Sequence, residues 1–161
     1  MVRKIGVIGA GLMGNGIAHV CAVAGYDVVL ADITQERLTD AMEVMGRNLD
    51  RQVRRGLLDE FVRVEAVHRI KTTTDYADFG DCDIVIEAAT ENEAVKRQVF
   101  EKLVPHLRAD AMIASNTSSI SITRLAATTD RPGRFMGVHF MNPVPMMSLV
   151  ELIRGIATEE E

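Results

Sequence analysis

Three glycines follow one another at spacings that suit the binding of a phosphate group. Gly9, Gly11 and Gly14 come directly after the apolar run Ile5–Ile8. In this order the first glycine makes a tight turn, the second lets the backbone approach a pyrophosphate, and the third lets a helix pack closely against the sheet. The N-terminus of that helix presents unpaired N–H groups and a partial positive charge to the phosphates. We therefore predict a dinucleotide site at this turn.

A carboxylate ends the next apolar run. Asp32 follows Val28–Ala31, and Gly25 before that run is placed to cap the intervening helix. A carboxylate at this point can accept hydrogen bonds from both ribose hydroxyls of an adenosine and would repel a 2′-phosphate. Neither Ile33 nor Thr34 supplies a cation for such a phosphate. The sequence therefore favours NAD over NADP, in the strand, glycine turn, helix, strand and acid order of the dinucleotide-binding fingerprint.

Three later side chains could transfer a proton beside such a cofactor. Ser118 lies in SNTSSISI, His139 in GVHFMNPVP and Glu151 in LVELI. Oxidation of an alcohol by NAD needs a base for the hydroxyl proton, and imidazole titrates near neutral pH. A carboxylate on the far ring nitrogen would fix the tautomer, and a serine hydroxyl would hold the substrate oxygen. The same residue types also suit a hydrolase, but the sequence lacks a GxSxG nucleophile elbow.

Each of these side chains also has a purely structural interpretation. His139 could be a core histidine, Glu151 could point to solvent by strand alternation, and Ser118 could cap a turn, with Ser119 as a competing hydroxyl. Lys96 could be a solvated lysine on a helix. Residue types and spacing alone leave these alternatives open.

Strand-like and helix-like segments alternate along the chain. Strands are predicted at 4–8, 27–31, 69–73, 83–88, 112–114, 135–140 and 148–153, and helices at 12–24, from 34 to a break at Gly56, and at 58–67, 93–107 and 122–127. This alternation predicts an α/β fold with a Rossmann-type, doubly wound, mainly parallel sheet and an antiparallel edge strand. Ligands of such sheets bind beyond the carboxyl ends of the strands. We therefore expect Asp32, Ala89–Glu91, Asn116–Ser118 and His139 to gather along one edge.

Length, charge and cysteine content narrow the class of protein further. The 161 residues suit one domain spanning 1–161, and a net charge of −5 without a basic stripe argues against a nucleic-acid partner. No apolar run is long enough to cross a bilayer, so no membrane is expected. Cys21 and Cys82 are expected to be buried free thiols in a reducing cytoplasm. No metal site is expected, because the methionines at 141, 146 and 147 lack His or Cys partners at ligand spacing.

Several motifs together resemble the short-chain L-3-hydroxyacyl-CoA dehydrogenase family, and its bacterial 3-hydroxybutyryl-CoA dehydrogenase branch most of all. They are GAGLMG, DIVIEA followed by Glu91 and Lys96, SNTSS, and HFMNPVP followed by the glutamate of LVELI. The resemblance implies NAD-dependent oxidation of (S)-3-hydroxyacyl-CoA to 3-ketoacyl-CoA, with His139 as general base and Glu151 as its partner. Substrate contacts are implied for Ser118, Asn48 and Arg55. Contacts to NAD are implied for Gly9, Gly11, Leu12, Met13, Gly14, Asp32, Glu91, Lys96, Ser118 and Asn142.

The resemblance also implies a second, all-helical domain that closes the acyl pocket. The chain ends at Glu161, about where that domain would begin, so we expect an isolated cofactor domain or a fragment. NAD binding is expected without the helical domain, whereas turnover is expected to need it, because an open site admits water. A homo-oligomer, or pairing with a helical domain through the apolar segment 149–153, is the expected assembly. A non-catalytic NAD-binding module, or a dehydrogenase of small 3-hydroxy acids, remains an alternative.

Overall fold

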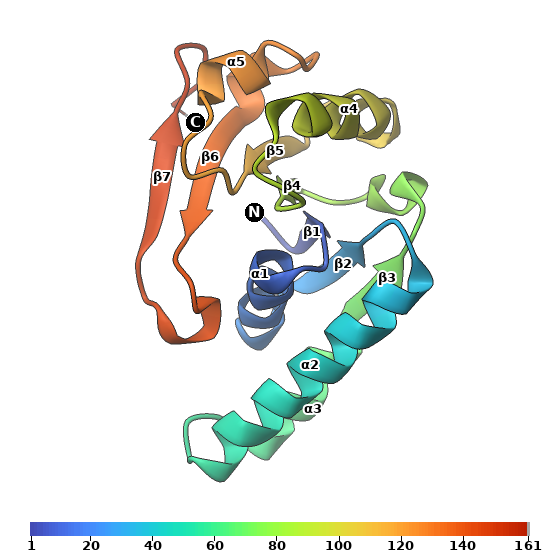
Figure 1. The fold of residues 1–161 in the computed structure, drawn as a ribbon, viewed down its shortest axis with the longest axis vertical. Coiled ribbons are helices and arrows are strands. Elements are labelled where there is room, and N and C mark those ends of the chain that lie inside the picture. The colour runs from blue at the N-terminus through green and yellow to red at the C-terminus, as the bar shows by residue number, and fades with distance from the viewer. Residues whose placement is uncertain (161) are drawn as a thin grey trace.

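The chain forms a sheet of seven strands in the order β3-β2-β1-β4-β5-β6-β7 (Figure 1). The computed structural model describes residues 1–160, so Glu161, the last residue of the predicted domain, lies outside the described residues. The strands are β1 (Lys4–Ile8), β2 (Asp27–Ala31), β3 (Ile70–Thr73), β4 (Ile84–Glu87), β5 (Met112–Ser115), β6 (Phe135–Phe140) and β7 (Val150–Arg154). Neighbouring strands from β3 to β6 pair in parallel, and β7 pairs antiparallel with β6. The predicted Rossmann-type sheet with an antiparallel edge is confirmed.

Helices cover both faces of the sheet and enclose two apolar cores (Figure 1). The helices are α1 (Leu12–Val23), α2 (Gln35–Arg54), α3 (Glu60–His68), α4 (Glu93–Leu103) and α5 (Ile122–Ala126). The core on the α1 and α2 side includes Ile17 and Leu38, and the core on the α4 and α5 side includes Phe100 and Leu125. Cys21 and Cys82 are buried free thiols, as predicted, and burial raises the pKa of each to about 12. Burial on both faces explains why the inner parallel strands, such as β4, are short and mostly apolar.

Local signals in the sequence set most helix boundaries. The Thr34 hydroxyl caps α2 by accepting a hydrogen bond from the N–H of Arg37 at 3.3 Å. Gly56, just past the end of α2, has a φ of +70°, which suits glycine. The predicted helix at 93–107 is wrong in its last turn, since α4 ends at Leu103 and a 3₁₀ turn covers Val104–His106. Pro105 explains the break, because proline has no N–H to donate and its ring crowds the preceding turn.

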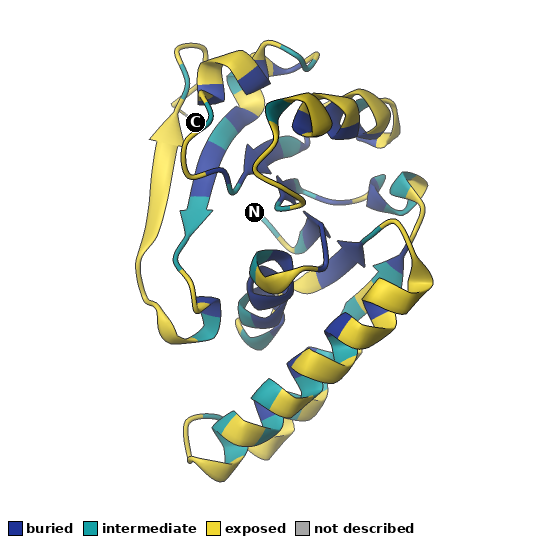
Figure 2. Ribbon diagram, viewed as in Figure 1, coloured by how far each residue is buried: buried dark blue, intermediate teal, exposed yellow. Residues whose placement is uncertain are grey.

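Helices α2 and α3 form an antiparallel hairpin that projects away from the sheet (Figure 1). Its outer half is largely exposed (Figure 2), and Arg63 of α3 holds Asp50 of α2 by an ion pair of 2.6 Å. The Asp59 side chain caps α3 by accepting a hydrogen bond from the N–H of Phe61 at 2.8 Å. No helix within residues 1–160 is long and apolar enough to cross a membrane. The hairpin therefore extends one side of the molecule as an exposed arm.

A buried histidine joins this arm to the body of the protein. His19 on α1 lies with Nε2 3.0 Å from Oε1 of Gln52 on α2. Among the described residues, Nδ1 of His19 is the one buried side-chain nitrogen or oxygen without a hydrogen-bond partner. Burial lowers the pKa of His19 below its ordinary value, although the hydrogen bond to Gln52 opposes the shift. The contact between α1 and α2 is thus built for a neutral imidazole.

This burial predicts a loss of stability in mild acid. The stabilisation that depends on neutral His19 is complete above the ordinary histidine pKa of 6.5 and is lost as the pH falls from there through the lower pKa of the folded protein. Urea unfolding at about pH 7.5 and about pH 5 should show a smaller acid-induced loss in His19→Gln than in the wild type. His68→Gln, which changes an exposed histidine, is the matched control and should behave as the wild type. Equal losses in His19→Gln and the wild type would contradict this role for His19.

Candidate active site

The carboxyl edge of the parallel strands carries the polar side chains that the sequence singled out. The glycine turn follows β1, and Asp32 follows β2. Glu87 ends β4 and Ser115 ends β5, with Glu91 and Ser118 in the loops that follow them. His139 is the next-to-last residue of β6. Because these strands run in parallel, their carboxyl ends meet at one edge, where the ligands of such sheets bind.

The glycine turn leaves its backbone open to a ligand. Gly9 has a φ of +98°, and a Cβ on Gly14 would lie only 1.6 Å from the carbonyl oxygen of Gly9. No atom lies within 4 Å of the place a Cβ would take on Gly11, and no side chain caps the first turn of α1. The first N–H groups of α1 are therefore free to bind an anion. These features fit the pyrophosphate of a dinucleotide.

Asp32 is fixed against the glycine turn by backbone hydrogen bonds. Its Oδ2 accepts a bond from the N–H of Ala10 at 2.8 Å, and its Oδ1 accepts one from the N–H of Ile33 at 2.7 Å. The Arg37 guanidinium lies 3.5 Å from Oδ1. Arg37 reaches Asp32 from the first turn of α2. This cation was not predicted, because only the two residues directly after Asp32 were considered as sources of positive charge.

Two clefts flank Asp32 and Arg37, and both residues line each of them. The first cleft, of about 440 Å³, lies between the glycine turn, α2 and the loop after β6, and Asn48 and Asn142 line it. The second cleft, of about 900 Å³, lies on the other side, where Tyr76, Ala89 and Lys102 line it. Arg55 lies at the end of α2, outside both linings. The resemblance implies substrate contacts for Asn48 and Arg55. Of these two residues, only Asn48 lines one of the two clefts.

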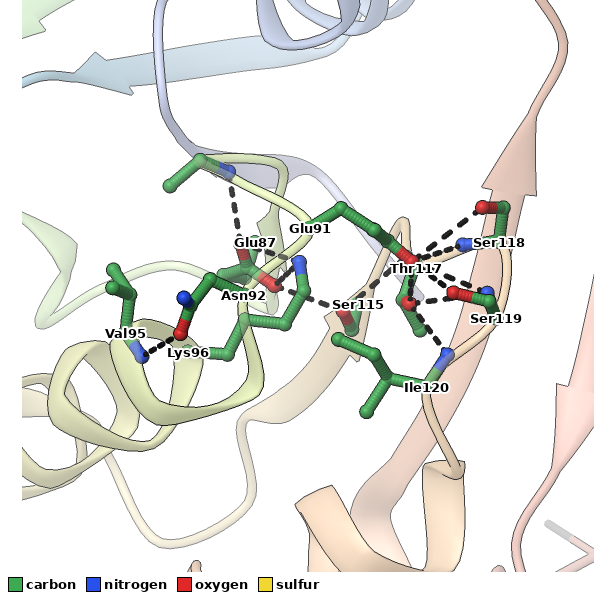
Figure 3. Close-up of polar contacts among 11 residues, drawn as sticks. Glu87, Glu91, Asn92, Val95, Lys96, Ser115, Thr117, Ser118, Ser119 and Ile120 are labelled. Atoms are coloured by element: carbon green, nitrogen blue, oxygen red, sulfur yellow. Dashed lines mark hydrogen bonds and ion pairs between the residues drawn. The ribbon is translucent and has the colours of Figure 1, made fainter.

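A buried ion pair joins β4 to α4 (Figure 3). Glu87 is 0% exposed and Lys96 only 2%, and Nζ of Lys96 lies 2.9 Å and 2.7 Å from the two carboxylate oxygens. The Ser115 hydroxyl and the N–H of Ala89 also donate to Glu87, each at 2.8 Å. The alternative of a solvated Lys96 is therefore wrong. The sequence analysis missed Glu87, although an acid within the apolar run DIVIEA is itself a signal that a buried charge needs a partner.

Glu91 holds the loop that carries Ser118 (Figure 3). Its Oε1 accepts hydrogen bonds from the Thr117 hydroxyl and from the backbone N–H groups of Ser118 and Ser119, the last two at 3.1 Å and 3.2 Å. Partial burial alone would raise the pKa of Glu91, but these donors and the charge of Lys96 lower it below its usual value. The carboxylate therefore fixes this loop in its ionised form.

The two serine hydroxyls differ in how firmly Glu91 holds them. Oγ of Ser119 lies 3.0 Å from Oε1 of Glu91, whereas Oγ of Ser118 lies 3.4 Å away, near the limit of a hydrogen bond. Both serines are exposed. The Ser118 hydroxyl is therefore the freer of the two for a ligand.

His139 and Glu151 stand opposite each other on the antiparallel strands β6 and β7. Nδ1 of His139 lies 2.8 Å from Oε2 of Glu151, and their side chains are 20% and 52% exposed. His139 is therefore not a core histidine satisfied by the backbone. Glu151 does more than face solvent, because it holds the imidazole. The side-chain oxygen of Asn116 accepts a hydrogen bond from the N–H of Phe140 at 2.8 Å. That bond ties the start of the Ser118 loop to the end of β6.

The fold and the open glycine turn beside Asp32 define a dinucleotide-binding protein of the Rossmann type. Over residues 4–161 the sequence matches the family described as "3-hydroxyacyl-CoA dehydrogenase, NAD binding domain". The chain belongs to this family, and its cofactor is NAD.

Two curated relatives and one solved structure illustrate the similarity. The chain is 56% identical over 160 residues to a 3-hydroxybutyryl-CoA dehydrogenase of Bradyrhizobium diazoefficiens, covering 99% of this chain and 55% of the relative. It is 48% identical over 158 residues to a probable 3-hydroxybutyryl-CoA dehydrogenase of Deinococcus radiodurans, covering 98% of this chain and 56% of the relative. The crystal structure of (S)-3-hydroxybutyryl-CoA dehydrogenase from Ralstonia eutropha superposes with a TM-score of 0.97 at 48% identity, covering 99% of this chain and 56% of that chain. The chain thus spans about half the length of these relatives.

The buried ion pair predicts a large loss of stability when only one partner is changed. Glu87→Gln should lower the free energy of unfolding by about 3–5 kcal/mol, because it leaves the charge of Lys96 buried without a counterion. Urea denaturation measures the loss, and the double variant Glu87→Gln/Lys96→Met should recover most of it. Glu93→Gln, which changes a surface ion pair on the same helix, is the control and should cost about 1 kcal/mol or less. A Glu87→Gln protein as stable as Glu93→Gln would show that the pair does not stabilise the fold.

Proposed function

We propose that the chain is the cofactor domain of an NAD-dependent dehydrogenase and carries most of its catalytic side chains. The reaction is (S)-3-hydroxyacyl-CoA + NAD⁺ ⇌ 3-ketoacyl-CoA + NADH + H⁺. The observation that carries the proposal is the hydrogen-bonded pair of His139 and Glu151 on the same sheet edge as the glycine turn. The names of the relatives, which are 3-hydroxybutyryl-CoA dehydrogenases, support a 3-hydroxyacyl-CoA substrate.

In this proposal His139 is the general base. An ionised Glu151 accepts the Nδ1–H of His139, so the neutral imidazole keeps its lone pair on Nε2. Nε2 takes the proton of the 3-hydroxyl group, and Glu151 stabilises the positive charge that the ring then carries. Bound NAD⁺ supplies the acceptor for the hydride that leaves the same carbon. In the reverse direction Nε2–H returns the proton to the carbonyl oxygen.

Ser118 is proposed to hold the reacting oxygen. Its hydroxyl is only weakly engaged by Glu91, at 3.4 Å, which favours it over the more firmly held Ser119. Glu91 fixes the backbone of both residues and so positions the Ser118 hydroxyl. The NAD contact assigned to Lys96 stays a prediction, and Nζ of Lys96 is held by Glu87.

The acyl-CoA is proposed to lie along α2. Asn48 lines the first cleft together with the glycine turn and Asn142. Arg55 follows Asn48 by seven residues, about two helical turns or about 10 Å along the helix axis, so both lie near one face of α2. The amide of Asn48 suits polar groups of the CoA, and the guanidinium of Arg55 suits a phosphate.

The exposed edge of the sheet is proposed to be covered in the whole protein. Every residue of β7 is exposed, including the apolar Leu152 and Ile153, and Leu149 before the strand is exposed too (Figure 2). An apolar edge strand of this kind favours association. A helical domain, or a second copy of the chain, is the proposed partner, and it would also exclude water from His139. A non-catalytic NAD-binding module is the alternative, and the His139–Glu151 pair argues against it.

Binding of NADH tests the cofactor site directly. Titration of the chain with NADH, followed by nucleotide fluorescence, should show saturable binding that weakens about tenfold or more in Asp32→Ala. Asp40→Ala removes another acid of the first cleft and should leave the affinity within about threefold. Failure of the wild-type chain to bind NADH would overturn the site.

A chimera tests the chemistry. The chain joined to the remaining half of the Bradyrhizobium diazoefficiens relative, supplied with acetoacetyl-CoA and NADH, should consume NADH. His139→Gln should lower kcat by about 10²–10⁴, because it removes the group that donates the proton in this direction and accepts it in the oxidation. Glu151→Gln should lower kcat while NADH affinity is kept. His68→Gln, which changes an exposed histidine outside both cleft linings, is the control. A wild-type chimera that binds NADH but leaves acetoacetyl-CoA unreduced would refute the substrate, and an active His139→Gln would refute the base.

A further inference from the structure

Arg37 places a positive charge beside the carboxylate that selects between NAD and NADP. Its Nη1 lies 3.5 Å from Oδ1 of Asp32, and its side chain is 63% exposed whereas that of Asp32 is only 8% exposed. The Thr34 cap fixes the first turn of α2, from which the Arg37 side chain extends toward the helix N-terminus and Asp32. Both clefts include Arg37 and Asp32 in their linings. The guanidinium therefore stands at the rim of the dinucleotide site and is open to solvent.

Asp32 does not depend on Arg37 for its own hydrogen bonds. Its two oxygens each accept a backbone N–H, from Ala10 and from Ile33, at 2.8 Å and 2.7 Å. Loss of Arg37 would leave this carboxylate hydrogen-bonded, so Asp32 would stay in place. Loss of the charge on Asp32, in contrast, would leave the Arg37 guanidinium without the carboxylate at 3.5 Å. The two charges thus have unequal roles in the site.

We propose that Arg37 is a specificity-determining residue, a cation for a 2′-phosphate that Asp32 masks in the native protein. With Asp32 ionised, a 2′-phosphate meets a negative charge at the ribose position and Arg37 is already paired. With Asp32 neutral, the planar guanidinium is free to form charge-assisted hydrogen bonds to the phosphate oxygens. The NAD preference therefore rests on one carboxylate, and the chain already holds a group that would accept NADP. This inference rests on the NAD site and not on the proposed oxidation, because binding alone tests it.

Two other basic side chains are near enough to compete for this role. Lys102 and His106 line the second cleft with Arg37 and Asp32. The other acids are Asp40 in the first cleft and Asp75 in the second. In the described residues, the cation that forms an ion pair with Asp32 is Arg37. That contact singles out Arg37, and Lys102 provides a matched control of equal charge.

The test compares the binding of NADH and NADPH, by nucleotide fluorescence, in a set of variants. Asp32→Asn keeps an oxygen for the N–H of Ala10 and removes the charge, so the glycine turn should hold. Its NADPH affinity should rise about ten- to hundredfold over the wild type. Asp32→Asn/Arg37→Gln should lose that gain, whereas Asp32→Asn/Lys102→Gln should keep it. The proposal fails if Asp32→Asn/Arg37→Gln binds NADPH as tightly as Asp32→Asn does, or if Asp32→Asn gains no affinity for NADPH.

A second measurement uses the native carboxylate, in case Asp32→Asn does not fold, as circular dichroism would reveal. Arg37→Gln in the wild-type background leaves the charge of Asp32 without its partner, so the carboxylate should repel a 2′-phosphate more strongly. The affinity for NADPH, measured by competition against NADH, should therefore fall more than the affinity for NADH. The ratio of the two dissociation constants should change about threefold or more. An equal effect on both nucleotides would show that the charge of Arg37 does not act at the 2′ position, and would contradict the proposal. Failure of the wild type to bind NADH would instead refute the dinucleotide site. Failure of the Arg37 proposal can therefore be distinguished from failure of the NAD site.

Discussion

A carboxylate with no exposed surface lies at the end of β4, and the loops of the site depend on how its charge is satisfied. Glu87 forms an ion pair with Lys96 of α4. It also accepts hydrogen bonds from the Ser115 hydroxyl of β5 and from the N–H of Ala89 in the loop after β4. A buried charge is costly unless it is paired and hydrogen-bonded, so these groups have few alternative arrangements. Lys96 in turn contributes to the low pKa of Glu91, whose carboxylate holds the loop at Ser118. The position of that serine thus depends on two successive carboxylates.

The two halves of the site differ in how completely this chain encloses them. The cofactor half consists of the open glycine turn and of Asp32, whose carboxylate is held by the backbone N–H groups of Ala10 and Ile33. The proposed catalytic half lies on β6 and β7, and every residue of β7 is exposed (Figure 2). An ion pair in contact with water is screened, whereas the same pair in a closed, less polar site interacts more strongly. The proposed cofactor site therefore lies within this chain, whereas the proposed proton transfer by His139 would benefit from a cover.

The architecture could be predicted because its signals are local. Apolar runs of strand length, the glycine spacing and caps such as Ser121 each depend on a few neighbouring residues. The helix predicted at 93–107 failed where Pro105 outweighs apolar periodicity. The pairing of Glu87 with Lys96, and of Asp32 with Arg37, could not be derived from sequence, because each depends on the direction in which a helix leaves the sheet edge. The ligand roles of the site residues came from a resemblance and remain proposals.

The ladder between β6 and β7 runs from Met136 opposite Arg154 to Phe140 opposite Val150, and so sets His139 against Glu151. A slip of one residue would turn Glu151 to the other face of the sheet. The connection 141–149 has no part in that ladder, yet its residues Asn142 and Val144 line the first cleft. In evolution, the shape of the first cleft and the His139–Glu151 pair can therefore change independently. Insertions in the connection can reshape the cleft for new ligands while the histidine–glutamate pair is inherited intact, whereas a single deletion inside β7 would destroy the pair.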